Sequence, residues 1–204
     1  MIIGLDFDNT IVSYDQLFHR VSVEQKLIDE TFDVNKIKIR NYLRSINKEN
    51  IWTEMQGYVY GFRMQEAAMF PLFKDFFLET IENGHKIVII SHKTKYPFIG
   101  EKYDLHEAAR SWVKKNLIRD EFTQFKQDDC FFEPTKDDKV KKIQEMKCDF
   151  YIDDLPEILQ NQYFPDSCNK ILFDPENNYQ ESNFNDISVK NSWTQIIEEI
   201  NFNN

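Results

Sequence analysis

Five short runs along the chain are apolar almost throughout and rich in β-branched and aromatic residues. They are Ile2 to Phe7, Lys86 to Ile90, Cys130 to Phe132, Phe150 to Ile152 and Lys170 to Phe173. Strands that are apolar on both faces are typical of a parallel sheet covered by helices on both sides. Segments with helical spacing separate the runs, as crossover connections require. The pattern therefore predicts an α/β protein with a parallel sheet flanked by helices.

Helical spacing predicts four helices between and after these strands. Pro71, a residue favoured in the first helical turn, and Asn83-Gly84, a pair that favours a helix end, mark the first of them. The other three are predicted at Asp104 to Leu117, Thr135 to Met146 and Val189 to Ile200.

About eighty residues separate the first two predicted strands, far more than a crossover helix needs. Residues 14–70 lie in this interval and have helical periodicity without a strong strand pattern. The sequence thus predicts a core of residues 1–13 and 71–204 and an inserted all-helical segment of residues 14–70. We expect this segment to form a cap over the edge of the sheet. The alternative is a bundle of helices that takes no part in the site.

Composition and charge narrow the class of function. The 204 residues are 41% hydrophobic and 15% aromatic, which indicates a folded domain rather than a disordered chain. A formal net charge of −10 argues against a nucleic-acid partner, because phosphate backbones are bound through clustered Lys and Arg. Cys130, Cys148 and Cys168 lack the spacing of a zinc site or a disulfide framework.

The chain begins with Met1 and a few apolar residues that run directly into acids. This start has no basic segment of the kind found in signal peptides, and no apolar stretch is long enough to span a membrane. We therefore expect a cytoplasmic protein without a membrane partner. No segment of the sequence points to a particular oligomeric state.

Polar residues stand where three of the predicted strands end. Asp6 and Asp8 end the first strand, Ser91 ends the second, and Asp153 and Asp154 follow the fourth. Ligands of an open parallel sheet bind beyond the carboxyl ends of its strands, so these side chains are expected to converge. Gathered carboxylates repel one another unless a cation lies among them. The pattern therefore predicts a divalent cation, and Mg²⁺ prefers such oxygen ligands.

The acids have different expected roles at this ion. Asp6 and Asp153 are predicted to bind it directly, with the backbone carbonyl of Asp8 as a further ligand. Asp154 is a direct ligand, supports the other ligands through a hydrogen bond, or pairs with Lys139.

The spacing of Asp6 and Asp8 predicts a two-step phosphoryl transfer, because residues two apart at a strand end point the same way. Asp6 would attack phosphorus and form an aspartyl-phosphate, and Asp8 would protonate the leaving oxygen and later activate water. Ser91 and the N–H that follows it can bind a phosphate oxygen. Lys139, at the start of a helix, can offset the acids and bind phosphate. His92 is a candidate substrate contact beside Ser91.

Four motifs, in this order, resemble those of the haloacid dehalogenase (HAD) superfamily. They are Asp6, Asp8 and Thr10 as DxDxT after the first strand, Ser91 closing the second, Lys139 on a helix, and Asp153-Asp154 after a later strand. The resemblance covers residues 1–12 and 71–204. It implies a Rossmann-like core of strand order 5-4-1-2-3, a Mg²⁺ ion, phosphoryl transfer through the first Asp, and phosphate contacts from Asn9 and Thr10. Because Asp8 is present, it implies a phosphatase rather than a dehalogenase.

Four lysines near the motifs leave alternatives open. Lys136 competes with Lys139 as the lysine of the third motif, and Lys139 is preferred because fourteen residues separate it from Asp153, enough for a helix and a return strand. Lys93, like Lys95, either reaches the polar part of a substrate or is solvated.

The favoured function is a magnesium-dependent phosphatase that acts on a small phosphorylated metabolite. A phosphomutase would share these motifs, and the IDDLPE segment that begins at Ile152 is similar to acid-pair motifs of some deoxynucleotidases. Two alternatives from a different class are a phospho-accepting signalling domain and a non-catalytic binding protein on the same scaffold. Against the first, the third predicted strand ends at Glu133-Pro134 rather than at a phospho-acceptor.

Overall fold

A computed structural model describes residues 1–118 and 124–200. The chain divides into two compact units. The first, here called the core unit, comprises Met1–Val12, Met69–Lys93 and Leu117–Asn204. The second, the helical unit, comprises Ser13–Ala68 and Thr94–Asn116. Two short strands, β2 (Val12–Ser13) and β3 (Ala68–Met69), pair where the chain passes between the units.

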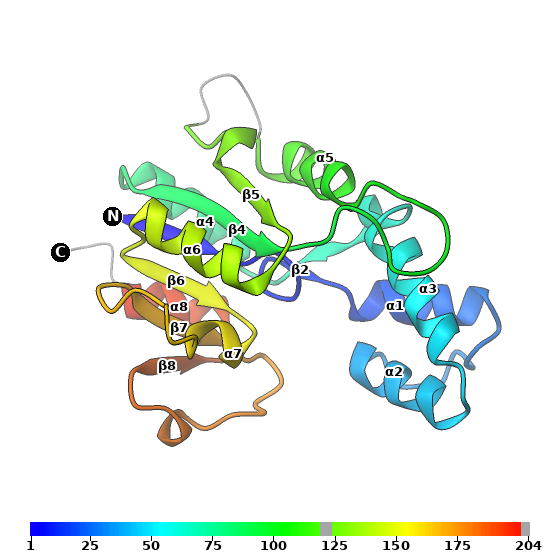
Figure 1. The fold of residues 1–204 in the computed structure, drawn as a ribbon. Helices are drawn as coiled ribbons and strands as arrows, with labels where there is room; N and C mark the ends of the chain where they lie inside the picture. The colour runs from blue at the N-terminus through cyan, green and yellow to red at the C-terminus, as the bar shows by residue number, and fades with distance from the viewer. Residues whose placement is uncertain (119–123, 201–204) are drawn as a thin grey trace. The chain divides into compact units, whose positions relative to one another are not determined.

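The core unit is built on a six-stranded sheet of order β5-β4-β1-β6-β7-β8 (Figure 1). Every neighbouring pair in this sheet is parallel. The strands are β1 (Ile2–Leu5), β4 (Lys86–His92), β5 (Cys130–Glu133), β6 (Phe150–Asp153), β7 (Asn169–Phe173) and β8 (Ile187–Lys190). The predicted fold class is confirmed, and the five predicted strands occur in the expected order.

The predicted start of the last helix is wrong. Val189 lies in β8, where it pairs with Leu172 of β7, and α8 spans Trp193–Ile200. Ile187 and Val189 alternate with Ser188 and Lys190, which is a strand pattern, but four residues directly before an amphipathic helix are too few to stand out. The sheet therefore has one edge strand more than the sequence predicts.

Helices cover both faces of this sheet (Figure 1). On one face lie α4 (Phe73–Glu82) and α8, and the centroid of the Trp193 ring of α8 lies 4.9 Å from that of Phe73 and 4.8 Å from that of Phe76 on α4. On the other face lie α6 (Lys136–Met146) and α7 (Pro156–Leu159). Because both faces are buried, the central strands carry apolar residues at almost every position.

A close contact fixes the centre of the sheet. Tyr151 of β6 lies opposite Gly4 of β1, and its hydroxyl donates a hydrogen bond to the carbonyl of Ile90 on β4. A Cβ atom on Gly4 would lie 2.6 Å from the Tyr151 ring and 2.8 Å from the Cys148 sulfur. Glycine at position 4 therefore lets the tyrosine side chain cross β1 and join three neighbouring strands.

The helical unit contains α1 (Asp15–Glu24), α2 (Lys36–Ser45), α3 (Glu49–Tyr60), the short η1 (Met64–Glu66) and all but the last residue of α5 (Leu105–Leu117). The sequence assigns the α5 segment to the core, whereas the structure groups residues 94–116 with the inserted segment. One reason is that the buried Trp112 indole of α5 donates a hydrogen bond to the Ala67 carbonyl, at 2.9 Å. Sequence distance conceals this association, because 45 residues separate the two partners.

Two further short 3-10 turns, η2 (Gln127–Asp129) and η3 (Glu181–Asn183), lie in loops of the core unit. Among the described residues, no helix has the length and apolar character needed to cross a membrane.

Candidate active site

The carboxyl ends of three adjacent strands bring together the acids that the sequence singles out. Asp6 directly follows β1, and its N–H donates to the Ile152 carbonyl of β6 at 2.9 Å, so the acid is held against the neighbouring strand. Asp153 is the last residue of β6, and Ser91 lies near the end of β4 on the other side. All three side chains are buried. Because the strands are parallel and adjacent, these three residues lie in one cluster although they are far apart in the sequence.

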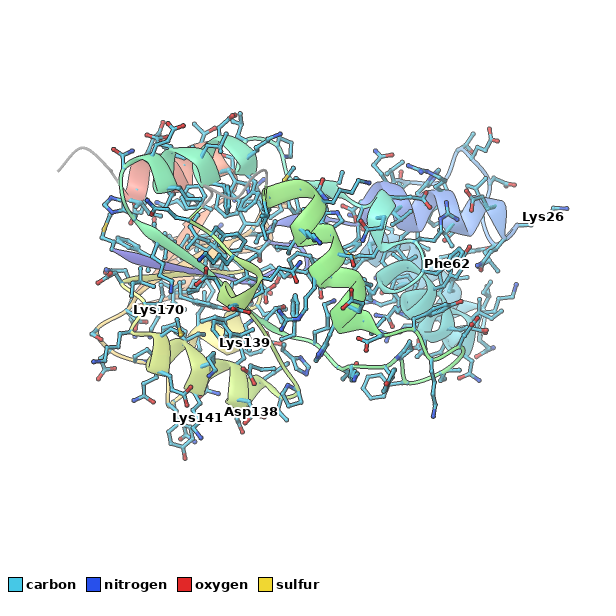
Figure 2. All side chains as sticks on the ribbon, turned by 90° about the horizontal axis from the view of Figure 1, so that it is seen from above. Lys26, Phe62, Asp138, Lys139, Lys141 and Lys170 are labelled. Atoms are coloured by element: carbon cyan, nitrogen blue, oxygen red, sulfur yellow. The ribbon has the colours of Figure 1, made fainter. Side chains whose placement is uncertain are left out.

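Lys139 lies between two of these acids. Its Nζ atom is 2.6 Å from Oδ1 of Asp6 and 2.6 Å from Oδ2 of Asp153, and the residue is 1% exposed. Its helix neighbours Asp138 and Lys141 point away from the sheet (Figure 2). Lys136, the competing candidate, instead pairs with Glu157 at the surface, at 2.9 Å. The structure therefore places Lys139, not Lys136, among the strand-end acids.

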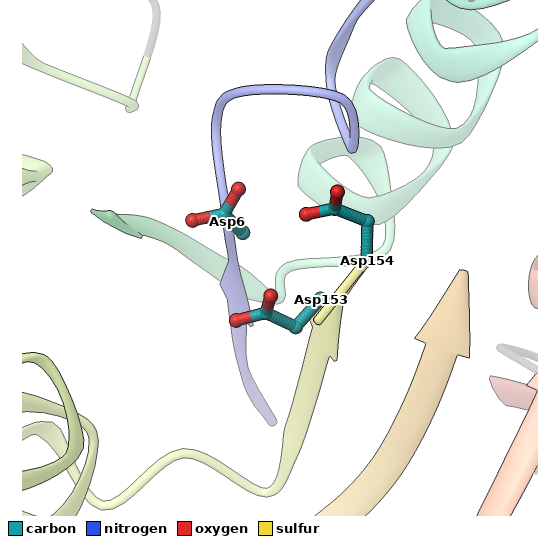
Figure 3. Close-up of side chains that lie close together, drawn as sticks. All are labelled: Asp6, Asp153 and Asp154. Atoms are coloured by element: carbon teal, nitrogen blue, oxygen red, sulfur yellow. The ribbon is translucent and has the colours of Figure 1, made fainter. Parts of the chain in front are cut away.

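Asp6, Asp153 and Asp154 form a candidate metal site. Each offers a carboxylate oxygen, and these oxygens lie within 4.8 Å of one another (Figure 3). The carboxyl group of Asp154 also accepts a hydrogen bond from the Asn9 amide, at 3.3 Å. Carboxylate oxygens at this spacing fit Mg²⁺, which uses few protein ligands and completes its shell with water and substrate phosphate.

The electrostatics of the cluster show an excess of negative charge. Burial raises the pKa of Asp153 to about 7 and also raises the pKa of Asp6, although Lys139 opposes both shifts. Burial alone would lower the pKa of Lys139, but Asp153 and Asp6 outweigh it and the pKa rises. Two buried carboxylates thus share one ammonium, with Asp154 adjacent. A divalent cation would stabilise the ionised form of all three acids.

The loop after β1 is a tight turn that carries Asp8, Asn9 and Thr10. The Phe7 carbonyl accepts hydrogen bonds from the N–H groups of Ile11 and Val12, both at 3.1 Å. Asn9 closes the turn with φ of 62°, a left-handed conformation that Asn tolerates better than most residues. Thr10 is fully buried, and its hydroxyl has no hydrogen-bond partner within the part of the chain that the structure describes.

Asp8 pairs with Lys93, a contact that the sequence does not predict. Lys93 directly follows β4, and its Nζ lies 2.6 Å from Oδ2 of Asp8. The residue is 5% exposed, so the interpretation of Lys93 as a solvated lysine is wrong. The available signal was its spacing, because Lys93 stands two positions after Ser91 and so projects from the same face of the strand.

His92 takes a different direction from its neighbours. Its Nε2–H donates to the Pro134 carbonyl, at 3.1 Å. Burial lowers the pKa of His92, and the hydrogen bond to Pro134 only partly opposes this. The ring nitrogen is therefore bonded to backbone in this structure, and burial favours the neutral form of the ring.

Comparisons with known proteins agree with this architecture. No family model matches the chain. A curated relative from Oceanobacillus iheyensis, named "Putative nucleotidase", is 26% identical over 170 residues, which is 78% of this chain and 79% of the relative.

Two solved structures share the fold. One is a HAD-superfamily hydrolase from Ehrlichia chaffeensis, with 13% identity, a TM-score of 0.52, and coverage of 98% of this chain and 95% of that one. The other is a dehalogenase, with 12% identity, a TM-score of 0.57, and coverage of 97% and 96%. The chain therefore has the fold of the HAD-superfamily hydrolases, and the resemblance drawn from its four motifs is confirmed at the level of the fold.

Proposed function

We propose that this protein is a HAD-superfamily phosphatase that hydrolyses a small phosphorylated metabolite with the help of Mg²⁺. The observation that carries the proposal is the contact of Lys139 with both Asp6 and Asp153 at the carboxyl ends of adjacent strands. A structural ion pair needs one carboxylate for each lysine. Here two buried carboxylates contact one lysine, and the Asp154 carboxylate lies beside those two acids, which favours a site that binds a cation and a phosphate.

The proposed mechanism assigns one task to each acid of the first motif. Asp6 attacks phosphorus and carries the phosphoryl group as an aspartyl-phosphate, while Asp8 protonates the leaving oxygen. Asp8 then takes a proton from the water that releases phosphate from Asp6. Ser91 and Lys139 hold Asp6 and bind phosphoryl oxygens, and Asn9, Thr10 and His92 are proposed as further phosphate or substrate contacts.

Mg²⁺ held by Asp6, Asp153, Asp154 and the Asp8 carbonyl would neutralise the phosphoryl oxygens. Lys139, which is buried between Asp6 and Asp153, contributes the fixed positive charge of the cluster.

A nucleotidase is the second, narrower candidate. It is favoured by the name of the Oceanobacillus iheyensis relative, which aligns over most of this chain. Nucleoside monophosphates are therefore the first phosphate esters to test.

We also propose that the helical unit acts as a cap that selects the substrate. The chain enters this unit at Ser13, shortly after Asp8, and enters it again at Thr94, directly after Lys93. Two of its connections thus start from the residues that surround the proposed site. A cap so connected would close over a bound substrate and exclude water.

Phosphate release with Mg²⁺ from nucleoside monophosphates, sugar phosphates and p-nitrophenyl phosphate tests the proposal. We expect release from at least one of them, a loss of at least about 10³-fold for Asp6→Asn as expected for a missing nucleophile, and little change for Asp186→Asn. Asp186→Asn is the matched control, because the Asp186 side chain is 66% exposed and pairs with Lys170. Full activity of the Asp6→Asn variant would contradict the assignment, and isomerised sugar phosphate without free phosphate would indicate a phosphomutase.

A further inference from the structure

The ends of β1 and β4 are joined by two contacts, one for each acid of the first motif. Ser91 donates a hydrogen bond to Asp6, and Lys93 donates one to Asp8 with Nζ 2.6 Å from Oδ2. The two strands are parallel neighbours, with Leu5 opposite Ile89. Because each pair of residues is two apart, both contacts lie on the same side of the strands. Each acid therefore has its own partner from β4.

The position of Lys93 is fixed from several directions. Its backbone N–H donates to the Glu133 carbonyl of β5 at 2.9 Å, which anchors the Cα atom beyond the end of β4. Its side chain is 3% exposed, and its ammonium lies 5.8 Å from the centroid of the Phe7 ring. A buried ammonium requires a carboxylate partner, because an unpaired one would be strongly destabilising. Loss of the contact with Asp8 would therefore destabilise the fold more than loss of a surface ion pair.

We propose that Lys93 is a positioning residue, which holds the Asp8 carboxyl group in place for proton transfer to the leaving group. The proposal rests on the phosphatase function proposed above. Lys93 engages one oxygen of Asp8 and so limits rotation of the carboxyl group about its Cβ–Cγ bond. General acid catalysis depends on such placement, since the proton must lie within hydrogen-bond reach of the oxygen that accepts it.

The formation and the hydrolysis of the proposed aspartyl-phosphate both need the Asp8 carboxyl group in the same position. In the first, an Asp6 oxygen bonds to phosphorus, the bond from phosphorus to the leaving oxygen breaks, and the Asp8 proton moves to that oxygen. In the second, water gives a proton to the Asp8 carboxylate while its oxygen bonds to phosphorus and the bond to Asp6 breaks. Lys93 transfers no atom in either step.

This role predicts a dependence on the leaving group. A nitrophenolate leaves without protonation, whereas the alkoxide of an alkyl or sugar phosphate requires a proton. Lys93→Met should therefore lower kcat for an alkyl phosphate by at least about tenfold, a part of the 10²–10⁴ that general acid catalysis contributes. The kcat for p-nitrophenyl phosphate should change by less than about threefold, and KM should stay similar for both. Lys93→Arg, which keeps the charge, should recover most of the kcat for the alkyl phosphate.

A double-mutant cycle shows whether Lys93 acts through Asp8. In an Asp8→Asn background, Lys93→Met should cause no further loss on the alkyl phosphate. Lys86→Met is the matched control, because Lys86 stands at the other end of β4 and pairs with Asp129 at 2.9 Å. It should leave both substrates unaffected, and circular dichroism and melting curves should show that each variant is folded.

Each other outcome overturns the proposal. Equal losses of kcat on both substrates would indicate a structural role, and a raised KM with unchanged kcat would make Lys93 a substrate contact. A further loss in the Asp8→Asn background would mean that Lys93 acts on another group. Failure of the wild type to release phosphate from any ester is a separate result, which contradicts the proposed function itself.

Discussion

At the scale of single residues, the candidate site has fewer lysines than acids. Lys139 contacts Asp6 and Asp153, and Lys93 contacts Asp8. The sequence predicted Asp6, Ser91, Lys139 and the acid pair because motif order and strand ends carry that information. It did not predict the pairing of Lys93, because burial of a lysine depends on neighbours that only the folded sheet supplies.

The raised pKa of Asp153 predicts how stability depends on pH in metal-free protein. Burial raises this pKa from 3.8 to about 7, so between these values the folded form binds more protons than the unfolded form. The contribution to stability is therefore present at low pH and lost as the pH rises toward 7. Urea unfolding in the presence of a chelator should give a free energy of unfolding that falls by at most about 1.4 kcal/mol per pH unit from this group.

The variant Asp153→Asn isolates this effect, because an amide does not titrate. Its stability should depend less steeply on pH than that of the wild type, whereas Asp186→Asn should keep the wild-type slope. Identical slopes for wild type and Asp153→Asn would show that Asp153 does not titrate in this range. Excess Mg²⁺ should flatten the wild-type curve if it binds the ionised acids.

At the scale of elements, the five predicted strands were correct because buried parallel strands are apolar almost throughout and rich in β-branched and aromatic residues. The edge strand β8 and the start of α8 were not predicted, since Ile187–Lys190 is short and runs close to an amphipathic helix. The grouping of α5 with the inserted helices depends on tertiary contacts such as that of Trp112 with Ala67. Periodicity describes which face of a helix is buried, but not which partner buries it.

Glycine at position 4 provides a test of the packing under the site. Gly4→Ala would bring a Cβ atom to 2.6 Å from the Tyr151 ring and 2.8 Å from the Cys148 sulfur. Overpacking of this kind costs about 1–3 kcal/mol, so the urea midpoint should fall accordingly. Adding Cys148→Ala removes one of the two close contacts and should recover part of the loss, whereas a neutral Gly4→Ala would show that β1 and β6 adjust freely.

At the scale of the whole molecule, the two units divide the proposed tasks. The core unit holds every acid of the four motifs, and the helical unit supplies a surface whose sequence carries no comparable motif. The sequence therefore predicts the reaction more sharply than the substrate. Because the net charge is −10, the phosphate group of the proposed substrate would be bound by local cations such as Lys139 rather than by a broad basic surface.

The most direct test of the account is detection of a phosphoryl group on Asp6. A substrate labelled in its phosphate is mixed with the protein and Mg²⁺, the reaction is stopped with acid within one turnover, and the labelled peptide is identified by mass spectrometry. The account predicts a label on the Asp6 peptide that is released by hydroxylamine, retained in Asp186→Asn and lost in Asp6→Asn. Phosphate release by the wild type without any label on Asp6, or a label that persists in Asp6→Asn, would contradict it.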